Sequence, residues 1–145
     1  MSPCVKASPA YAEVFAALHA AVFAHAPWDK NAFSALLSQP TVLALLHEEN
    51  GFLLLQVVLD EAEILTFGTT QKRCGIGTHL LRAGLEALAA TGVTRLFLEV
   101  ASSNHEAQAF YKKFNFVVTG RRKAYYEDGD DALVMCLLCP SSGDA

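Results

Sequence analysis

The sequence predicts an α/β fold, in which helices pack on a mixed sheet. Two amphipathic helical patterns open the chain, three strand-like runs follow, and helix and strand patterns alternate in the second half. The order ααβββαβαββ is typical of a mixed-sheet domain. At 145 residues, with 52% of them apolar, the chain can bury one core. We expect a single domain over residues 1–139 and a disordered tail over residues 140–145.

The first half of the chain contains two predicted helices and three predicted strands. Residues 8–23 place apolar side chains at helical spacing, and residues 27–40 give a second helix with Asp29 as its cap. Short turns separate three strand-like runs, at residues 41–47, 51–59 and 62–67. We expect these runs to form an antiparallel meander.

The second half begins with a helix after Gly77, which ends near Gly92. Residues 94–100 are apolar after Arg95 apart from one glutamate, so we expect a strand buried on both faces. Residues 102–114 form a helix, whose start carries the capping-box pattern Ser103-x-x-Glu106. Two more strands, at residues 116–120 and 131–138, flank a charged segment with two tyrosines.

Composition excludes several classes of protein. A net charge of −4 argues against general nucleic-acid binding, and no apolar run is long enough to span a membrane. The N-terminal residues lack a signal-peptide pattern, and the four cysteines show no disulfide framework. Cys136 and Cys139 form a C-x-x-C without a second ligand pair, so we expect no metal site. We expect a cytoplasmic protein, either a monomer or a weak dimer, without nucleic-acid or membrane partners.

The stretch QKRCGIG before the third predicted helix contains a glycine turn. It lacks the Walker pattern, and Leu80 occupies the position of the third glycine in a dinucleotide fingerprint. Gly75 and Gly77 allow a close bend that leaves unpaired N–H groups at a helix start, next to Lys72 and Arg73. Alone, this pattern fits either an anion site or a plain turn.

The segments around this turn resemble the GNAT (Gcn5-related N-acetyltransferase) family. The resemblance covers nearly the whole chain and includes the glycine loop, the strand LFLEV and the helix SSNHEAQAFYKKFNF. Within the family, PWDKNAFSALLSQP, AEILTF and GRRKAYYEDGDDALVM look most like the bacterial ribosomal-protein-alanine N-acetyltransferases. The resemblance implies a central mixed, mostly antiparallel twisted sheet flanked by about four helices. Asn115 replaces a family glycine, so we expect a left-handed conformation there.

The resemblance also implies acetyl-coenzyme A as the cofactor. Lys72 stands where the family has Gln or Arg, and the approach to the loop is about two residues shorter than usual, so we expect backbone N–H groups to make most of the pyrophosphate contacts. Asn104 could contact the cofactor or serve only the first turn of its helix. The expected cofactor-binding residues are Phe67, Gly68, Lys72, Arg73, Cys74, Gly75, Ile76, Gly77, Thr78 and Asn104.

Two residues are candidates for proton transfer. Glu99 is the only charged residue in its strand after Arg95, and the resemblance implies a general base at this position. The alternative is a strand-end carboxylate that reaches solvent. Tyr111 is the candidate acid that returns a proton to the departing thiolate; the alternative is a core aromatic at helical spacing.

The implied reaction is acetyl transfer to the N-terminal α-amine of a protein, in particular a ribosomal protein. An α-amine is about 10% neutral at pH 7 and a lysine about 0.04%, so a single base suits the former better. We expect Trp28, Tyr125 and Tyr126 to line the substrate site, with core packing as the alternative for Trp28. Two other functions remain open: acetylation of a small-molecule amine, and a non-catalytic acyl-CoA-binding module, which would need neither Glu99 nor Tyr111.

Overall fold

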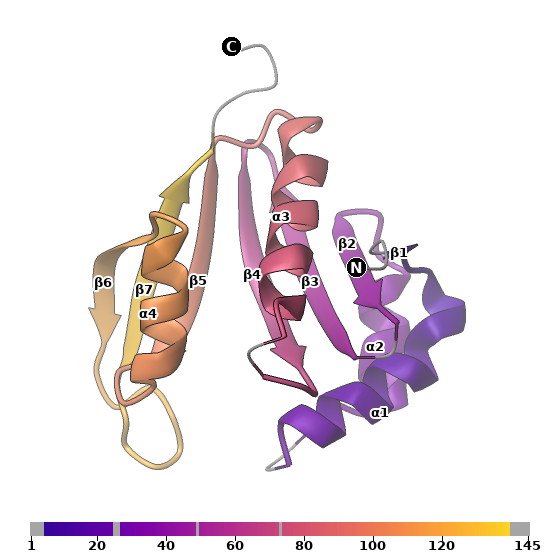
Figure 1. The fold of residues 1–145 in the computed structure, drawn as a ribbon, viewed down its shortest axis with the longest axis horizontal. Coiled ribbons are helices and arrows are strands. Elements are labelled where there is room, and N and C mark those ends of the chain that lie inside the picture. The colour runs from indigo at the N-terminus through magenta and orange to yellow at the C-terminus, as the bar shows by residue number, and fades with distance from the viewer. Residues whose placement is uncertain (1–4, 25–26, 49, 73, 140–145) are drawn as a thin grey trace.

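A seven-stranded sheet forms the centre of the computed structural model (Figure 1). The structure describes residues 5–24, 27–48, 50–72 and 74–139. The strand order is β1-β2-β3-β4-β5-β7-β6, and all neighbouring strands are antiparallel except the parallel pair β4 and β5. This confirms the predicted mixed, mostly antiparallel sheet. The predicted tail, residues 140–145, lies outside the described residues.

The predicted order of helices and strands is also confirmed. The helices are the 3-10 turn η1 (Pro9–Tyr11), α1 (Ala12–Val22), α2 (Lys30–Leu37), α3 (Ile76–Ala89) and α4 (His105–Lys113). The strands are β1 (Val5–Lys6), β2 (Val42–His47), β3 (Gly51–Val58), β4 (Glu61–Thr69), β5 (Arg95–Ala101), β6 (Val117–Arg122) and β7 (Ala132–Leu138). Only β1 was not predicted, because two residues are too few to show a period in the sequence.

Helices cover the two faces of the sheet unequally. Leu53 and Leu55 of β3 pack in one apolar cluster with α3 and α4, whereas Phe52 and Leu54 pack in a second cluster with α1 and α2. Successive side chains of a strand point to opposite faces, so the two helix pairs lie on opposite sides of the sheet. Helix α3 lies so close to β3 that a Cβ atom at Gly84 would meet the Leu53 side chain at 2.7 Å.

Strands β4 and β5 separate along their length. They pair only from Glu61 opposite Arg95 to Glu63 opposite Phe97, and Figure 1 shows them moving apart beyond that point. Within β4, Leu65 forms a β-bulge against β3. A bulge bends and twists its strand. The carboxyl-terminal halves of the two strands are therefore not paired with each other.

The structure corrects the prediction that β5 is buried on both faces. Leu96, Leu98 and Val100 are buried under α3 and α4, but Phe97 and Glu99 on the other face are only half-buried. The reason is that α1 and α2 pack over the β2–β4 side of that face and leave β5 uncovered.

The start of α4 also differs from the prediction. Asn104 is its N-cap and accepts a 3.1 Å hydrogen bond from the N–H of Ala107. The hydroxyl of Ser103 instead donates to Asp130 in the β6–β7 loop. The predicted capping box is therefore wrong, although the helix itself is where the pattern placed it. Asn115 after the helix has φ 73°, the left-handed conformation that was predicted.

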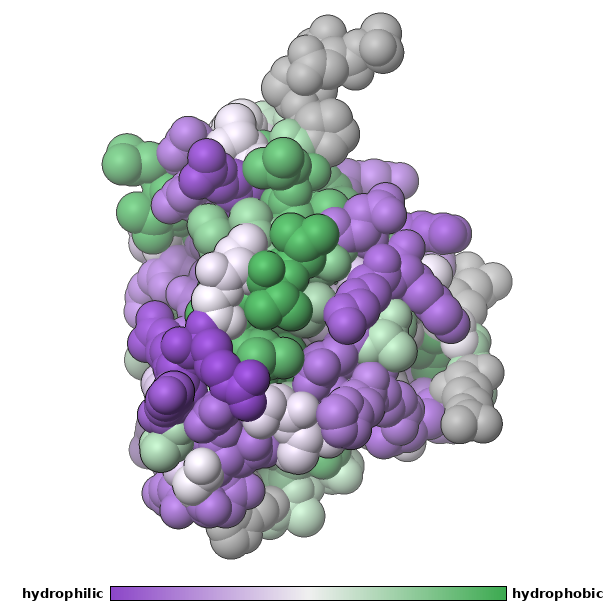
Figure 2. All heavy atoms as spheres, turned by 90° about the vertical axis from the view of Figure 1, so that its left-hand side faces the viewer, coloured by the Kyte–Doolittle hydropathy of each residue, from purple (hydrophilic) through white to green (hydrophobic). Residues whose placement is uncertain are grey.

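Strand β6 forms one edge of the sheet. Val117 and Val118 on this strand are 59% and 47% exposed. Figure 2 views the molecule from this side and shows apolar side chains in a strip between hydrophilic ones.

Candidate active site

The glycine turn makes an open start to α3. Gly75 is the N-cap residue and has φ 78°, a conformation that a side chain would strain. The first helical hydrogen bond runs from the N–H of His79 to the carbonyl of Gly75, and no side chain caps the helix. The N–H groups of the first turn are therefore available to an anion.

A pocket of about 860 Å³ lies in front of this helix start. Its walls come from the end of α1, the end of β4, the glycine turn and one side of α4. Most of the predicted cofactor residues line it, namely Phe67, Gly68, Lys72, Gly75, Ile76, Gly77, Thr78 and Asn104. Cys74 is exposed and is not among the lining residues, and Arg73 lies outside the described residues.

Lys72 and the walls beside it give the pocket its character. The Lys72 ammonium lies 3.9 Å from the Glu106 carboxylate of α4, and both side chains are largely exposed. The Phe67 ring of β4 lies 5.8 Å from the Phe110 ring of α4. A Cβ atom at Gly77 would meet both rings at an ordinary 3.6 Å, so Gly77 faces the space between them. The pocket thus has a cationic and N–H-rich mouth next to an aromatic wall.

Tyr111 lies at the inner end of this pocket. Its residue is 9% exposed, and its ring packs 5.4 Å from Phe116 and 6.3 Å from Phe67. Burial raises the pKa of the Tyr111 hydroxyl well above its usual range. Tyr111 therefore both packs in the core and lines the pocket as a phenol that stays protonated.

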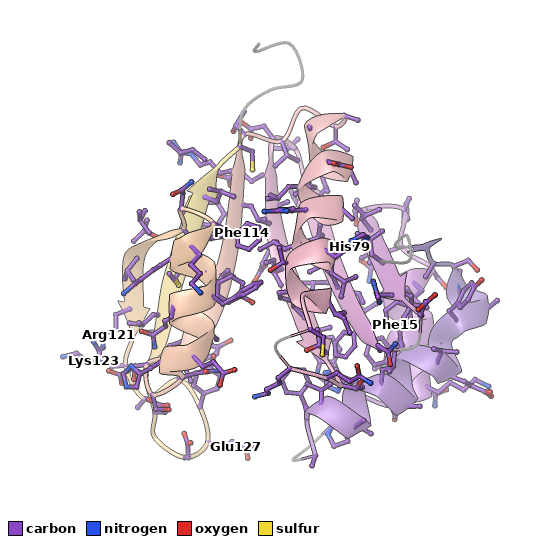
Figure 3. The ribbon with its side chains drawn as sticks, in the orientation of Figure 1. Phe15, His79, Phe114, Arg121, Lys123 and Glu127 are labelled. Atoms are coloured by element: carbon purple, nitrogen blue, oxygen red, sulfur yellow. The ribbon has the colours of Figure 1, made fainter. Side chains whose placement is uncertain are left out.

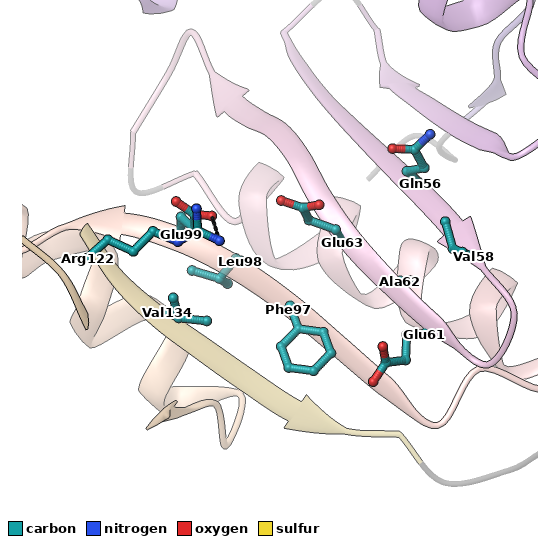
Figure 4. Close-up of a pocket in the computed structure, with 10 residues that line it drawn as sticks. All are labelled: Gln56, Val58, Glu61, Ala62, Glu63, Phe97, Leu98, Glu99, Arg122 and Val134. Atoms are coloured by element: carbon teal, nitrogen blue, oxygen red, sulfur yellow. Dashed lines mark ion pairs between the residues drawn. The ribbon is translucent and has the colours of Figure 1, made fainter. Parts of the chain in front are cut away.

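Glu99 lies in a different pocket, on the other face of the sheet. This groove of about 300 Å³ runs over the end of β3, the start of β4 and the middle of β5 (Figure 4). Its lining residues are Gln56, Val58, Glu61, Ala62, Glu63, Phe97, Leu98, Glu99, Arg122 and Val134. Three of them are glutamates, and Figure 4 shows Glu63 and Glu99 on either side of the separation between β4 and β5.

The two oxygens of Glu99 have different surroundings. Oε1 lies 3.4 Å from a guanidinium nitrogen of Arg122 on β6. Oε2 is buried and has no hydrogen-bond partner among the described residues. The Glu99 side chain is 20% exposed, so it is neither a solvent-reaching strand end nor fully enclosed.

The β6–β7 loop places Tyr125 beside Arg122 and Tyr126 within reach of the charge of Glu99, but neither tyrosine is among the residues that line the groove or the larger pocket. Burial and then the negative charge of Glu99 raise the pKa of the Tyr126 hydroxyl. Tyr125 is 51% exposed and packs edge-on against Tyr126 at 5.1 Å. Arg121, Lys123 and Glu127 project from the same region in Figure 3.

Hydrogen bonds hold both ends of this loop. The Ser102 hydroxyl donates to Asp130 at 2.6 Å, and Arg121 donates to Asp131 at the same distance. The N–H of Ala124 also donates to Asp131, at 2.8 Å. The loop is therefore tied to the strand and helix that carry the candidate catalytic residues.

Trp28 is held away from both pockets. Its ring stacks on His19 at 5.0 Å and lies 5.7 Å from Phe33, and the backbone N–H of Trp28 donates to Nδ1 of His19 at 3.1 Å. It is half-buried beside the cluster under α1 and α2 and lines neither pocket. Trp28 therefore packs against the core, and its predicted contact with a substrate stays a prediction that its exposed part would have to fulfil.

Several lining residues were missed from the sequence. Val22 and Phe23 at the end of α1, and Phe110 of α4, line the larger pocket. Arg122 in the groove was treated as part of a charged connection, but it belongs to β6. Alternation along β6 could have indicated the position of Arg122, whereas the contribution of α1 depends on how that helix crosses β4.

No group of three His, Cys, Asp or Glu side chains that could hold a metal ion occurs in the part of the chain that the structure describes. Within the same residues, no helix is long and apolar enough to cross a membrane.

Comparison with known proteins identifies the family. Residues 19–116 match the family model of the acetyltransferase (GNAT) family. The chain is 38% identical over 117 residues to a Bacillus subtilis (strain 168) protein assigned as a ribosomal protein bS18-alanine N-acetyltransferase, covering 75% of this chain and 78% of the relative. It is 35% identical over 132 residues to the Escherichia coli (strain K12) ribosomal protein bS18-alanine N-acetyltransferase, covering 84% and 88%. The crystal structure of the Escherichia coli ribosomal-protein-S18-alanine N-acetyltransferase superposes with a TM-score of 0.88 at 28% identity, covering 99% of this chain and 97% of that one.

The separated strands β4 and β5, with an N–H-rich pocket at the start of α3 and a carboxylate groove on the face that carries Glu99, therefore define an N-acetyltransferase. The chain belongs to the GNAT family, and its acetyl donor is acetyl-CoA.

Proposed function

We propose that this enzyme acetylates the N-terminal α-amine of a protein, and that its acceptor is the N-terminal alanine of ribosomal protein bS18. The relatives named for that activity support the acceptor. The observation that carries the proposal is the Glu99 groove, which lies on an uncovered half of the sheet. An open groove can admit the end of a polypeptide, whereas a small amine would call for a deep closed pocket.

Acetyl-CoA supplies an acetyl group that is activated as a thioester. The free N–H groups at the start of α3 and the cation of Lys72 suit its pyrophosphate, and the aromatic wall suits its apolar arm. The resemblance implies that the backbone of Thr66 to Gly68 holds the pantetheine. This segment lies where β4 has lost its pairing with β5.

The proton steps use one residue from each face. Glu99 accepts the proton of the incoming ammonium through its partnerless oxygen. Tyr111, protonated because it is buried, donates to the departing thiolate. Asn104 orients the first turn of α4 beside the pocket. Retention of both proton-transfer groups favours an enzyme over a non-catalytic acyl-CoA-binding module.

Tyr125 and Tyr126, which lie next to Arg122 and Glu99, contact the acceptor beyond the lining of the groove, and Trp28 contacts it only through its exposed part. We further propose that the enzyme works in the cytoplasm as a monomer or weak dimer and as a single domain. Light scattering after size-exclusion chromatography tests the oligomeric state.

The experiment is an acetylation assay with acetyl-CoA and a panel of N-terminal peptides, read by thiol release and by peptide mass. We expect acetylation of peptides that begin with the bS18 N-terminus. The matched control is the same peptide with a blocked N-terminus and a free lysine. Tight acetyl-CoA binding without turnover of any peptide would refute the proposed function, and turnover of polyamines alone would favour the small-amine alternative.

A further inference from the structure

We propose that Arg122 is the positioning residue of the reaction, because it fixes the Glu99 carboxylate and selects which of its oxygens takes the proton. This inference rests on the proposed role of Glu99 as the base.

The first support is charge. Among the described residues that line the groove, Arg122 is the one cation, and three carboxylates, those of Glu61, Glu63 and Glu99, line the same groove. Its guanidinium lies 3.4 Å from Oε1 of Glu99, whose side chain is 20% exposed. Like charges in a partly buried groove repel one another. Arg122 therefore offsets the charge that would otherwise push Glu99 out of place.

The second support is the inequality of the Glu99 oxygens. A buried carboxylate oxygen without a hydrogen-bond partner costs free energy, so such an atom in a folded protein calls for a functional explanation. Arg122 holds Oε1 and leaves Oε2 as the orphan. An incoming ammonium is the donor that this oxygen lacks. The ion pair thus sets the orientation of the base before the acceptor arrives.

The third support is a contact that links Glu99, through Arg122, to the β6–β7 loop. The Arg122 guanidinium carbon lies 5.5 Å from the centre of the Tyr125 ring, in a cation–π arrangement. Tyr125 packs against Tyr126, and burial together with the negative charge of Glu99 raises the pKa of the Tyr126 hydroxyl. One planar guanidinium therefore contacts both the Glu99 carboxylate and the Tyr125 ring. Lysine keeps the charge but cannot make both contacts with the same geometry.

The test starts with Arg122→Met, assayed with acetyl-CoA and the peptide that wild type acetylates. We expect kcat to fall roughly tenfold, because a displaced reacting group loses rate steeply, while the KM for acetyl-CoA is unchanged. Arg122→Lys should recover part of this loss. Arg82→Met, which removes a cation from the exposed side of α3, is the matched control and should behave as wild type. Thermal unfolding and acetyl-CoA binding of each variant check that the fold is intact.

A double-mutant cycle separates positioning of Glu99 from a general structural effect. If Arg122 acts through Glu99, then Arg122→Met adds little to the loss already caused by Glu99→Gln. Losses that multiply would overturn the inference, as would wild-type kcat in Arg122→Met while Glu99→Gln is impaired. Wild-type kcat in Glu99→Gln would instead refute the proposed base, and the inference with it.

Discussion

Glu99 and Tyr111 lie on opposite faces of the same sheet. Tyr111 packs in the cluster that contains Leu98 and Val100, whereas Glu99 alternates to the other side of β5 and lines the groove. Strands β4 and β5 lose their pairing beyond Phe97, so no main-chain ladder joins them at the level of Glu99. This arrangement suits a transfer in which donor and acceptor approach from opposite sides.

The first prediction concerns the base. Glu99→Gln should lower kcat with the bS18 peptide about 100-fold, the lower end of the range for general base catalysis, because an α-amine is already partly neutral at pH 7. Acetyl-CoA affinity, measured by calorimetry, should not change, since Glu99 lines the other pocket. Glu86→Gln on α3 is the control for loss of a carboxylate. Wild-type turnover in Glu99→Gln would show that another group removes the proton.

The second prediction concerns the acid. Tyr111→Phe should lower kcat roughly 100-fold without loss of thermal stability, since phenylalanine fills the same core position. The raised pKa of Tyr111 keeps the phenol protonated as pH rises. Deprotonation of Tyr111 should therefore cause no loss of the wild-type rate below pH 10. An alkaline loss of rate below pH 10 that disappears in the variant would contradict the raised pKa, whereas wild-type kcat in Tyr111→Phe would contradict the assignment of Tyr111 as the acid.

The fold was largely predictable, because long amphipathic patterns determine its elements. Residues 8–23 and 76–89 show the helical period clearly, and the apolar runs of β2, β3 and β4 are bounded by turn residues. The failures are local. The choice between Ser103 and Asn104 as the cap depends on Asp130, which lies 27 residues from Ser103 in the sequence and accepts a hydrogen bond from its hydroxyl.

The site was predictable where a motif carries it and not where packing creates it. The glycine turn and the residues around it line one pocket as the pattern indicated. The contact between Arg122 and Glu99 depends on the register of β6, β7 and β5, which no local pattern in the sequence records. The sequence could not show whether Trp28 packs in the core or lines the substrate site, because its position depends on stacking and a hydrogen bond with His19, nine residues away.

The third prediction separates the two glycines of the turn. Gly77→Ala should leave the free enzyme as stable as wild type or more stable, by up to about 1 kcal/mol, because Gly77 is helical and alanine is the better helix former. The added methyl would enter the pocket, so acetyl-CoA binding should weaken. Gly75→Ala should instead lower stability by about 1 kcal/mol, because its φ of 78° strains a side chain. Thermal unfolding with and without acetyl-CoA measures both effects, and unchanged affinity in Gly77→Ala would remove Gly77 from the cofactor site.

The fourth prediction concerns His19 and the position of Trp28. Burial lowers the pKa of His19 below its ordinary value of 6.5, and Nδ1 of His19 accepts a hydrogen bond from the backbone N–H of Trp28. The folded protein therefore favours the neutral ring. Between the lowered and the ordinary pKa the unfolded chain binds more protons than the folded one, and stability therefore falls as pH drops below about 6.5. Above that pH the contribution of His19 is complete.

Trp28 gives this prediction a local measurement, because it is the only tryptophan in the chain. Its fluorescence should titrate at a pH below 6.5 as the stacked His19 ring gains a proton, and the unfolding temperature should fall over the same interval. His19→Asn keeps an acceptor but cannot gain the charge, so both changes should shrink in that variant. His79→Asn, on the other side of the sheet, controls for titration of another histidine. Equal acid sensitivity of Trp28 fluorescence in His19→Asn and wild type would show that the position of the ring does not depend on the protonation of His19.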